Sequence, residues 1–182
     1  MTNTDNQERV AFWLLPAEEE TRLLEEIISQ LANTFHTPVF QPHLTLATIP
    51  SAQIDNPAAF LEQLSAKTPE LTLEYSGTPI ASDRYNQALI LPCDLAPGLA
   101  AIVRSLHRQH HVPDDYLPHV SLLYANLDQK TGQRLCQEIR LVKKTLHFNK
   151  ISAIKIGPET TSAEDVMSWQ VLATSRLRAK ES

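Results

Sequence analysis

Two short segments of the sequence repeat the same order of residue types. PHLTL occupies residues 42–46 and PHVSL occupies residues 118–122. Each consists of a proline, a histidine, an apolar residue, a hydroxyl residue and a leucine. Such alternation is typical of a strand with one buried face, and a proline is tolerated where a strand begins. The sequence therefore predicts two similar strands, each presenting a histidine and a hydroxyl together.

The imidazole and the hydroxyl of each strand point to the same side, because strand side chains alternate between faces. His43 thus lies beside Thr45, and His119 beside Ser121. If the two strands face one cleft, their two imidazoles and two hydroxyls together suit metal-free phosphodiester hydrolysis. A neutral imidazole takes a proton from water, and a protonated one gives a proton to the departing sugar oxygen. The hydroxyls hydrogen-bond the phosphate oxygens as negative charge builds. A cyclic phosphate is especially suitable, because its strained ring supplies part of the driving force.

The alternative interpretation is two unrelated strand histidines. In a chain with seven histidines, a histidine two residues before a Ser or Thr is expected to occur by chance. Context favours the paired site. Both histidines follow a proline, and both have apolar residues one and three positions after the histidine. Both motifs also fall at matching places in the predicted order of elements. The two motifs are too similar to assign base and acid, so both assignments stay open.

The elements around the two motifs repeat as well. Hydrophobic spacing predicts an initial strand at 10–15 and then, in each half, a helix, the histidine strand, a second helix and two strands. The predicted ranges are 17–33, 43–49, 57–66, 71–76 and 87–92, followed by 97–110, 119–125, 129–141, 146–157 and 168–175. This order indicates an internal duplication. We expect residues 1–182 to form one α+β domain of two pseudo-symmetric lobes, each an antiparallel sheet with outer helices, around an active-site cleft.

Composition narrows the class of protein. The net charge of −5, from 16 Lys and Arg against 21 Asp and Glu, argues against a protein that grips long nucleic acid. A small anionic ligand remains compatible, because a pocket can be locally positive. The N-terminal sequence does not resemble a signal peptide, no apolar run is long enough for a membrane helix, and two cysteines are too few for a disulfide framework. We expect a cytoplasmic monomer with reduced thiols.

The histidine segments resemble the paired motifs of the two-histidine (2H) phosphoesterase superfamily. The stretch YLPHVSLLYA at 116–125 resembles the second motif of plant and fungal cyclic phosphodiesterases, and FWLLP at 12–16 resembles their N-terminal strand. The resemblance implies a two-lobed α+β fold with a water-filled cleft. It also implies hydrolysis of nucleoside 2′,3′-cyclic phosphates to 2′-phosphates, or of ADP-ribose 1″,2″-cyclic phosphate to the 1″-phosphate.

The same resemblance assigns roles to individual residues. It makes His43 and His119 the acid–base pair, with Thr45 and Ser121 as their phosphate-binding companions. No cofactor and no metal ion are implied.

Three aromatic residues complete the site that the resemblance implies. Trp13 would wall the cleft and stack on a base or ribose, although a core tryptophan is the alternative. Tyr124 matches the tyrosine that closes the family's second motif, but strict alternation would point it away from His119, so it reaches the cleft only if the strand bends or bulges. Tyr85 stands where related enzymes often have an aromatic residue that faces the ligand, and a surface loop position is the alternative.

Other chemistry receives less support. His107 and His111 stand one helical turn apart and could share a metal ion, but a polar helix end explains them more simply. The chain has no Gly-x-Gly, so a dinucleotide or P-loop nucleotide site is not expected.

Two rival functions stay open. One is an RNA-end-processing enzyme of the 2′,5′ ligase or phosphodiesterase kind, which needs a basic path for the strand. The other is a non-catalytic module that binds a nucleotide in the same cleft.

Overall fold

The computed structural model describes residues 8–75, 77–107, 112–141 and 143–179. Its strands are β1 (Arg9–Pro16), β2 (Leu44–Pro50), β3 (Leu71–Glu74), β4 (Ile80–Ala81), β5 (Leu89–Pro92), β6 (His119–Leu123), β7 (Thr145–Ile156) and β8 (Gln170–Arg176). Its α-helices are α1 (Glu18–Phe35), α2 (Pro57–Lys67), α3 (Pro97–Leu106), α4 (Gln129–Glu138) and α5 (Ala163–Met167), and short 3₁₀ turns occupy η2 (Ser51–Gln53) and η3 (Tyr85–Gln87). The predicted α+β class and its order of long elements are confirmed.

Local sequence signals explain where the helices begin. α2 starts at a proline, and the side chain of Asn56 accepts a hydrogen bond from the backbone N–H of Ala59. The Asp128 side chain caps α4 in the same way. Three glutamates occupy the first turn of α1, where their charge suits the helix dipole. α5 was not predicted; it is a single short helix whose capping box pairs Ser162 with Asp165.

All the strand pairs are antiparallel and form one sheet in the order β3-β7-β1-β2-β6-β5-β4, with β8 paired to β7. β2 and β6 meet at a single residue pair, Leu44 with Val120. The prediction of two sheets is therefore corrected in one respect: the two parts are continuous through this pair. Each residue of this pair directly follows the histidine of its own motif.

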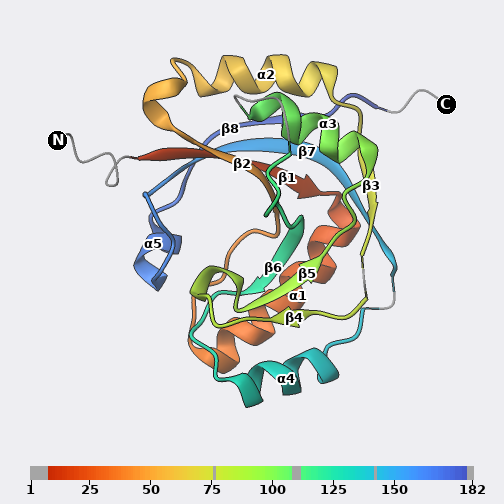
Figure 1. Ribbon diagram of the computed structural model, residues 1–182, viewed down its shortest axis with the longest axis vertical. Coiled ribbons are helices and arrows are strands. Elements are labelled where there is room, and N and C mark those ends of the chain that lie inside the picture. The colour runs from red at the N-terminus through yellow and green to blue at the C-terminus, as the bar shows by residue number, and fades with distance from the viewer. Residues whose placement is uncertain (1–7, 76, 108–111, 142, 180–182) are drawn as a thin grey trace.

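The two parts of the sheet differ in size, with five strands and three, but each histidine strand has an antiparallel neighbour in its own part. β1 pairs with β2 in one part, and β5 pairs with β6 in the other. α1 precedes β2 in sequence but packs against β6, whereas α3 precedes β6 and packs against β2. Figure 1 shows the consequence: α2 and α3 cover the part that contains β7 and β8, while α1 and α4 lie on the part that contains β5 and β6.

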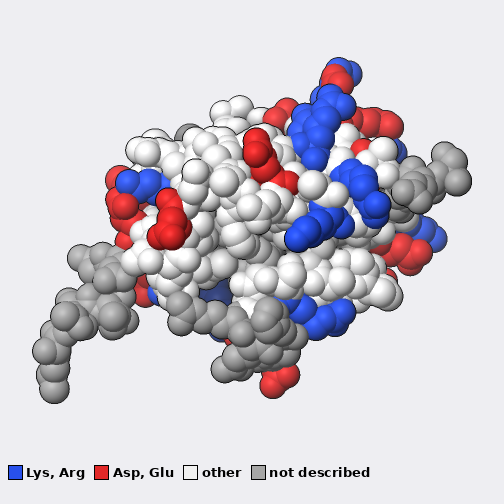
Figure 2. Space-filling view, turned by 90° about the horizontal axis from the view of Figure 1, so that it is seen from above, with Lys and Arg blue, Asp and Glu red and all other residues white. Residues whose placement is uncertain are grey.

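The surface carries charges of both signs. Figure 2 shows Lys and Arg side chains gathered over one half of the face seen from above, with Asp and Glu side chains among them and at the margin. No helix of the described residues has the length and apolar character needed to cross a membrane.

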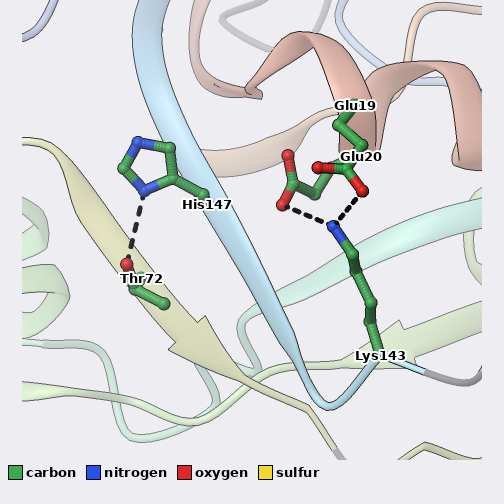
Figure 3. A network of polar contacts seen from close by, with 5 residues as sticks. All are labelled: Glu19, Glu20, Thr72, Lys143 and His147. Atoms are coloured by element: carbon green, nitrogen blue, oxygen red, sulfur yellow. Dashed lines mark hydrogen bonds and ion pairs between the residues drawn. The ribbon is translucent and has the colours of Figure 1, made fainter.

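A small polar network ties the start of α1 to the segment before β7. Lys143 Nζ lies 2.8 Å from a carboxylate oxygen of Glu19 and 3.5 Å from one of Glu20 (Figure 3). The pKa of Lys143 is raised by these carboxylates, the hydrogen bond with Glu19 being the largest cause. In the same figure His147 pairs with Thr72 across β7 and β3. Glu19 is exposed and Lys143 is partly exposed, so their ion pair adds little free energy and mainly orients the two elements.

The central strand pair depends on apolar packing, which gives a first prediction. Phe12 of β1 is fully buried and its ring packs 5.3 Å from that of Phe60 on α2. Phe12→Ala should lower the free energy of unfolding by about 3–5 kcal/mol, because it leaves a cavity beneath α2. Urea unfolding measures the change. Val171→Ala, at a side chain that is 63% exposed, serves as control and should cost less than about 1 kcal/mol; equal losses would contradict this account of the core.

Candidate active site

The seven residues proposed from the sequence line a single cavity of about 650 Å³. They are Trp13, His43, Thr45, Tyr85, His119, Ser121 and Tyr124. They come from β1, the two histidine strands and η3, so segments far apart in the sequence contribute to one concave surface. The structure thus brings together all the side chains that the sequence analysis selected.

A β-bulge in β6 explains how Tyr124 reaches the cavity. Ile90 of β5 pairs with Ser121, but the preceding residue of β5, Leu89, pairs with Leu123, so Leu122 has no partner of its own. The extra residue reverses the alternation beyond it. Leu122 and Leu123 consequently both pack in the core, and Tyr124 turns to the same side as Ser121. The condition set for Tyr124 by strand alternation is thus met.

β2 carries the same irregularity at the same place. Trp13 of β1 pairs with Thr45, but Phe12 pairs with Ala47, so Leu46 is the extra residue. Leu46 and Ala47 are both buried in the core, and Thr48 lines the cavity. Thr48 therefore stands where Tyr124 stands in the other half. Sequence reasoning missed it, although its spacing of five residues from His43 matches that of Tyr124 from His119 and was the available signal.

Both histidines are oriented by a backbone carbonyl two residues earlier. Nδ1 of His43 lies 2.7 Å from the carbonyl oxygen of Gln41, and Nδ1 of His119 lies 2.7 Å from that of Leu117. A carbonyl only accepts hydrogen bonds, so Nδ1 must carry the proton in each ring. When either ring is neutral, its Nε2 is then left with the lone pair, which is the state of a general base.

An aromatic residue three positions before each histidine braces the opposite motif. Phe40 packs on Tyr124, with ring centroids 4.3 Å apart, and the hydroxyl of Tyr116 donates a hydrogen bond of 2.9 Å to the backbone carbonyl of Thr45. The repeated phrase therefore extends over 40–48 and 116–124. Each half supplies an aromatic side chain that fixes the other half's histidine strand.

Trp13 makes the two histidines unequal. Its indole stacks on the His43 ring, with centroids 3.6 Å apart and planes 11° apart. His43 is only 4% exposed, and burial lowers its pKa to about 4; the hydrogen bond to Gln41 opposes this shift and the charge of His119 adds to it. Burial also lowers the pKa of His119, which is less covered. His43 is thus the ring held more firmly in the neutral form.

The stacked imidazole changes the expected role of Trp13. The family resemblance implied that the Trp13 ring stacks on a base or ribose. One face of the ring instead lies against His43, and its centroid is 5.1 Å from that of Trp169 in an edge contact. Only 5% of Trp13 is exposed. Trp13 lines the cavity as expected, yet its main contact is with the histidine. Its position favours orienting and desolvating His43 over stacking on substrate.

Tyr124 and Tyr85 form the opposite wall. Their rings are nearly parallel, with centroids 6.4 Å apart. The backbone carbonyl of Tyr85 also accepts a hydrogen bond from the backbone N–H of Ala125. Burial raises the pKa of Tyr124 to about 12, against the effect of its hydrogen bond with Ser121, and burial also raises the pKa of Tyr85. Both phenols therefore stay protonated near neutral pH and can donate hydrogen bonds to an anion.

Trp169 is a cavity residue that the sequence analysis did not identify. It follows α5, and its ring meets those of Trp13, His43 and Tyr124 edge-on at 5.1–5.9 Å. Val166 of α5 packs in the same cluster as Tyr124, which fixes the helix over the site. The sequence that follows α5, SWQVL, gave only a strand pattern, and the position of Trp169 depends on the unpredicted turn of helix before it.

Metal ligation and thiol chemistry gain no support from the part of the chain that is described. His111, and with it the suggested His107–His111 pair, lies outside that part, and no group of three or more potential ligands is found among the described residues. Cys93 and Cys136 are free, and burial raises the pKa of Cys93 to about 12. The Cys93 thiol is therefore protonated and unreactive near neutral pH.

Comparison with known proteins defines the class. A family model described as cyclic phosphodiesterase-like protein matches residues 9–177. The chain therefore belongs to the cyclic phosphodiesterase-like family, within the 2H phosphoesterase superfamily. A cyclic phosphodiesterase of Arabidopsis thaliana is 24% identical over 178 residues, which cover 91% of this chain and 93% of the relative.

Solved structures share the fold. A phosphoesterase crystal structure aligns with a TM-score of 0.59 at 18% identity, covering 94% of this chain and 99% of the other. Escherichia coli LigT complexed with ATP aligns with a TM-score of 0.58 at 16% identity, covering 95% and 99%. The protein TT0787 of Thermus thermophilus aligns with a TM-score of 0.54 at 17% identity, covering 95% and 100%. These likenesses show that the chain shares its fold with these structures.

The depressed pKa of His43 gives a prediction for stability against pH. The pKa of His43 is about 4 in the folded chain and near 6.5 in the unfolded chain. Between pH 6.5 and pH 4, the His43 imidazole therefore gains a proton only in the unfolded state. The free energy of unfolding is fully retained above pH 6.5 and should fall by up to about 3 kcal/mol as the pH drops towards 4. Urea unfolding of the wild type and His43→Gln at several pH values isolates this contribution, because the variant keeps every other titrating group. Parallel curves for the two proteins would contradict the burial of a neutral His43.

Proposed function

We propose that the protein is a metal-independent cyclic phosphodiesterase that hydrolyses nucleoside 2′,3′-cyclic phosphates, ADP-ribose 1″,2″-cyclic phosphate, or both, to monoesters. The observation that carries the proposal is the pairing of two imidazoles, each held through Nδ1 by a carbonyl and each beside a hydroxyl, in one cavity. Such an arrangement supplies a proton acceptor and a proton donor on one phosphate group. Membership of the cyclic phosphodiesterase-like family supports the same reaction class.

The reaction requires one proton to be taken up and one to be given. A water oxygen attacks the phosphorus while Nε2 of one histidine takes a proton from that water. The bond between phosphorus and one ring oxygen breaks, and the second histidine gives its Nε2 proton to that oxygen, which becomes a sugar hydroxyl. The two rings end in exchanged protonation states and return to the starting state by proton exchange with solvent.

The unequal burial of the histidines supports one assignment of roles. His43, stacked beneath Trp13, is kept neutral and acts as general base. His119 is less covered and acts as general acid, because it is the ring that accepts a proton from solvent at lower cost. Trp13 acts here as a positioning residue, since its contact is with the base.

Hydroxyl groups around the histidines would bind the phosphate oxygens. Thr45 and Ser121 lie beside their histidines, and Tyr124 adds a phenol that is linked to Ser121 by a hydrogen bond. Ser121 otherwise has only a long 3.4 Å contact with the carbonyl of Asn86, so its hydroxyl is available to an incoming oxygen. These neutral donors stabilise charge that develops in the transition state without requiring a metal ion.

The RNA-end-processing alternative has less support. An RNA strand needs a basic path, and the net charge of −5, from 16 Lys and Arg against 21 Asp and Glu, gives that requirement little support. E. coli LigT structures of the same fold are complexed with 3′-AMP, ATP, NADP⁺ and phosphate, which supports a small nucleotide as the ligand class. Turnover of a cyclic mononucleotide against an oligonucleotide with the same end separates the two. Tight binding without turnover would establish the non-catalytic alternative.

Removing either imidazole tests the proposed function. His43→Ala and His119→Ala should each lower turnover of 2′,3′-cyclic AMP by about 10²–10⁴-fold, the range expected for a lost proton transfer. Phosphorus NMR quantifies the reaction and identifies the product isomer, and excess chelator should leave wild-type turnover intact. His147→Ala is the matched control, because His147 pairs with Thr72 outside the cavity. Near-full activity in both cavity variants would refute the mechanism.

A substrate whose leaving group needs no proton tests the assignment of roles. On a nitrophenyl phosphodiester, His119→Ala should recover most of its activity relative to wild type, because nitrophenolate departs as an anion. His43→Ala should stay impaired by about 10²-fold or more, because the attacking water still needs a base. Release of nitrophenolate is followed by absorbance. Recovery in His43→Ala instead would reverse the two roles.

A further inference from the structure

Two arginines line the cavity without a part in the proposed proton transfers. Arg9 begins β1, and Arg84 precedes η3 on the opposite wall. Neither side chain forms an ion pair with another described residue. Glu159, which is exposed, is the one carboxylate among the described lining residues. Among these lining residues, two guanidinium groups therefore outnumber one carboxylate.

The pairing of β1 places Arg9 at a defined distance from the reacting groups. Arg9, Ala11 and Trp13 alternate with core residues, and all three line the cavity. Their spacing along a regular strand puts the Cα atoms of Arg9 and Trp13 roughly 13 Å apart. Ala11 lies between them and has only a methyl side chain, so it leaves space for a ligand between the two larger side chains. A ligand whose phosphate lies at His43 can extend over Ala11 towards Arg9.

Arg84 approaches from the other side. Its backbone N–H donates a hydrogen bond of 3.2 Å to the side chain of Ser82, and the η3 turn that follows carries Tyr85 and Asn86, both in the cavity wall. The loop is thus fixed to the same wall as Tyr124. The Arg84 side chain is exposed and unpaired within the described chain, which suits contact with an entering anion.

We propose that Arg9, assisted by Arg84, binds a second phosphate group of the substrate, remote from the cyclic phosphate that reacts. A guanidinium presents several N–H donors in a plane and binds phosphate oxygens in pairs, which makes arginine well suited to this task. Thr45, Ser121 and Tyr124 supply hydroxyl donors near the two histidines, whereas Arg9 lies four residues before Trp13 along β1, so its position suits a different anion. The volume of about 650 Å³ lies within the range that holds a ligand of nucleotide size.

The inference rests on the proposed function and narrows its substrate class. Cyclic phosphates that carry another phosphate are preferred over a plain nucleoside 2′,3′-cyclic phosphate. The second group can be a 5′-phosphate, an internucleotide phosphate or a diphosphate bridge, all of which present the same oxygens to a guanidinium.

The test compares two substrates that differ only in the second phosphate. Adenosine 2′,3′-cyclic phosphate and its 5′-phosphorylated form are assayed with the wild type, Arg9→Ala, Arg84→Ala and the double variant. The wild type should show the higher kcat/KM on the 5′-phosphorylated form. Arg9→Ala should reduce that preference by about 10-fold or more, as expected for a lost charged hydrogen bond. Arms with a dinucleotide and with ADP-ribose cyclic phosphate identify the source of the second phosphate.

Arg134→Ala provides the matched control, because it removes one positive charge from α4, outside the cavity. It should leave the preference between the two substrates unchanged. Equal losses on both substrates in Arg9→Ala, or the absence of any wild-type preference, would overturn the inference while leaving the phosphodiesterase activity established.

A binding measurement separates failure of this inference from failure of the proposed function. If the wild type turns over neither substrate, calorimetric titration with adenosine 2′,5′-bisphosphate and adenosine 2′-monophosphate still measures how much the second phosphate adds to binding affinity. Tighter binding of the bisphosphate in the wild type but not in Arg9→Ala supports the assignment. Equal affinities in the wild type reject it.

Discussion

The extra residue that follows each hydroxyl, Leu46 in β2 and Leu122 in β6, sets the geometry of the site. In a regular strand the residues at the histidine, two further on and four further on share a face. The bulge sends two successive apolar residues into the core and turns the fifth residue after the histidine into the cavity. Thr48 and Tyr124 gain their places in this way, and the histidine strands stay anchored by apolar packing on their other face.

The repeated geometry yields two chemically different histidines because the neighbouring strands differ. Trp13 of β1 pairs with Thr45, and Ile90 of β5 occupies the matching position beside Ser121. An indole stacks on the face of His43, whereas no aromatic ring of the described residues stacks on His119. Desolvation therefore depresses the pKa of one ring to about 4 while the other remains more accessible. A symmetric framework thus supports a reaction that needs one base and one acid.

Much of this could be predicted from the sequence, because its strongest signals are periodic. The helices and strands follow hydrophobic spacing, and the shared face of His43 with Thr45 and of His119 with Ser121 follows from alternation alone. Bulges are not visible in such patterns, since they depend on which residue of β1 or β5 pairs with which residue of the histidine strand. Alternation alone did not place Thr48 on the cavity side, and only its spacing from His43, equal to that of Tyr124 from His119, pointed to it. Trp169 was missed because it depends on α5, a five-residue helix defined by the side-chain bonds of Ser162 and Asp165, which hydrophobic periodicity does not detect.

The central claim is that both imidazoles act on a single phosphorus atom. The most direct measurement is a crystal structure of the protein with a nucleoside 2′-phosphate. We expect the phosphate to lie between the two rings, with one of its oxygens within hydrogen-bond distance of Nε2 of His43 and another within that distance of Nε2 of His119. The hydroxyls of Thr45 and Ser121 should contact the remaining oxygens. A phosphate that contacts only one of the rings, or that binds outside this cavity, would contradict the central claim.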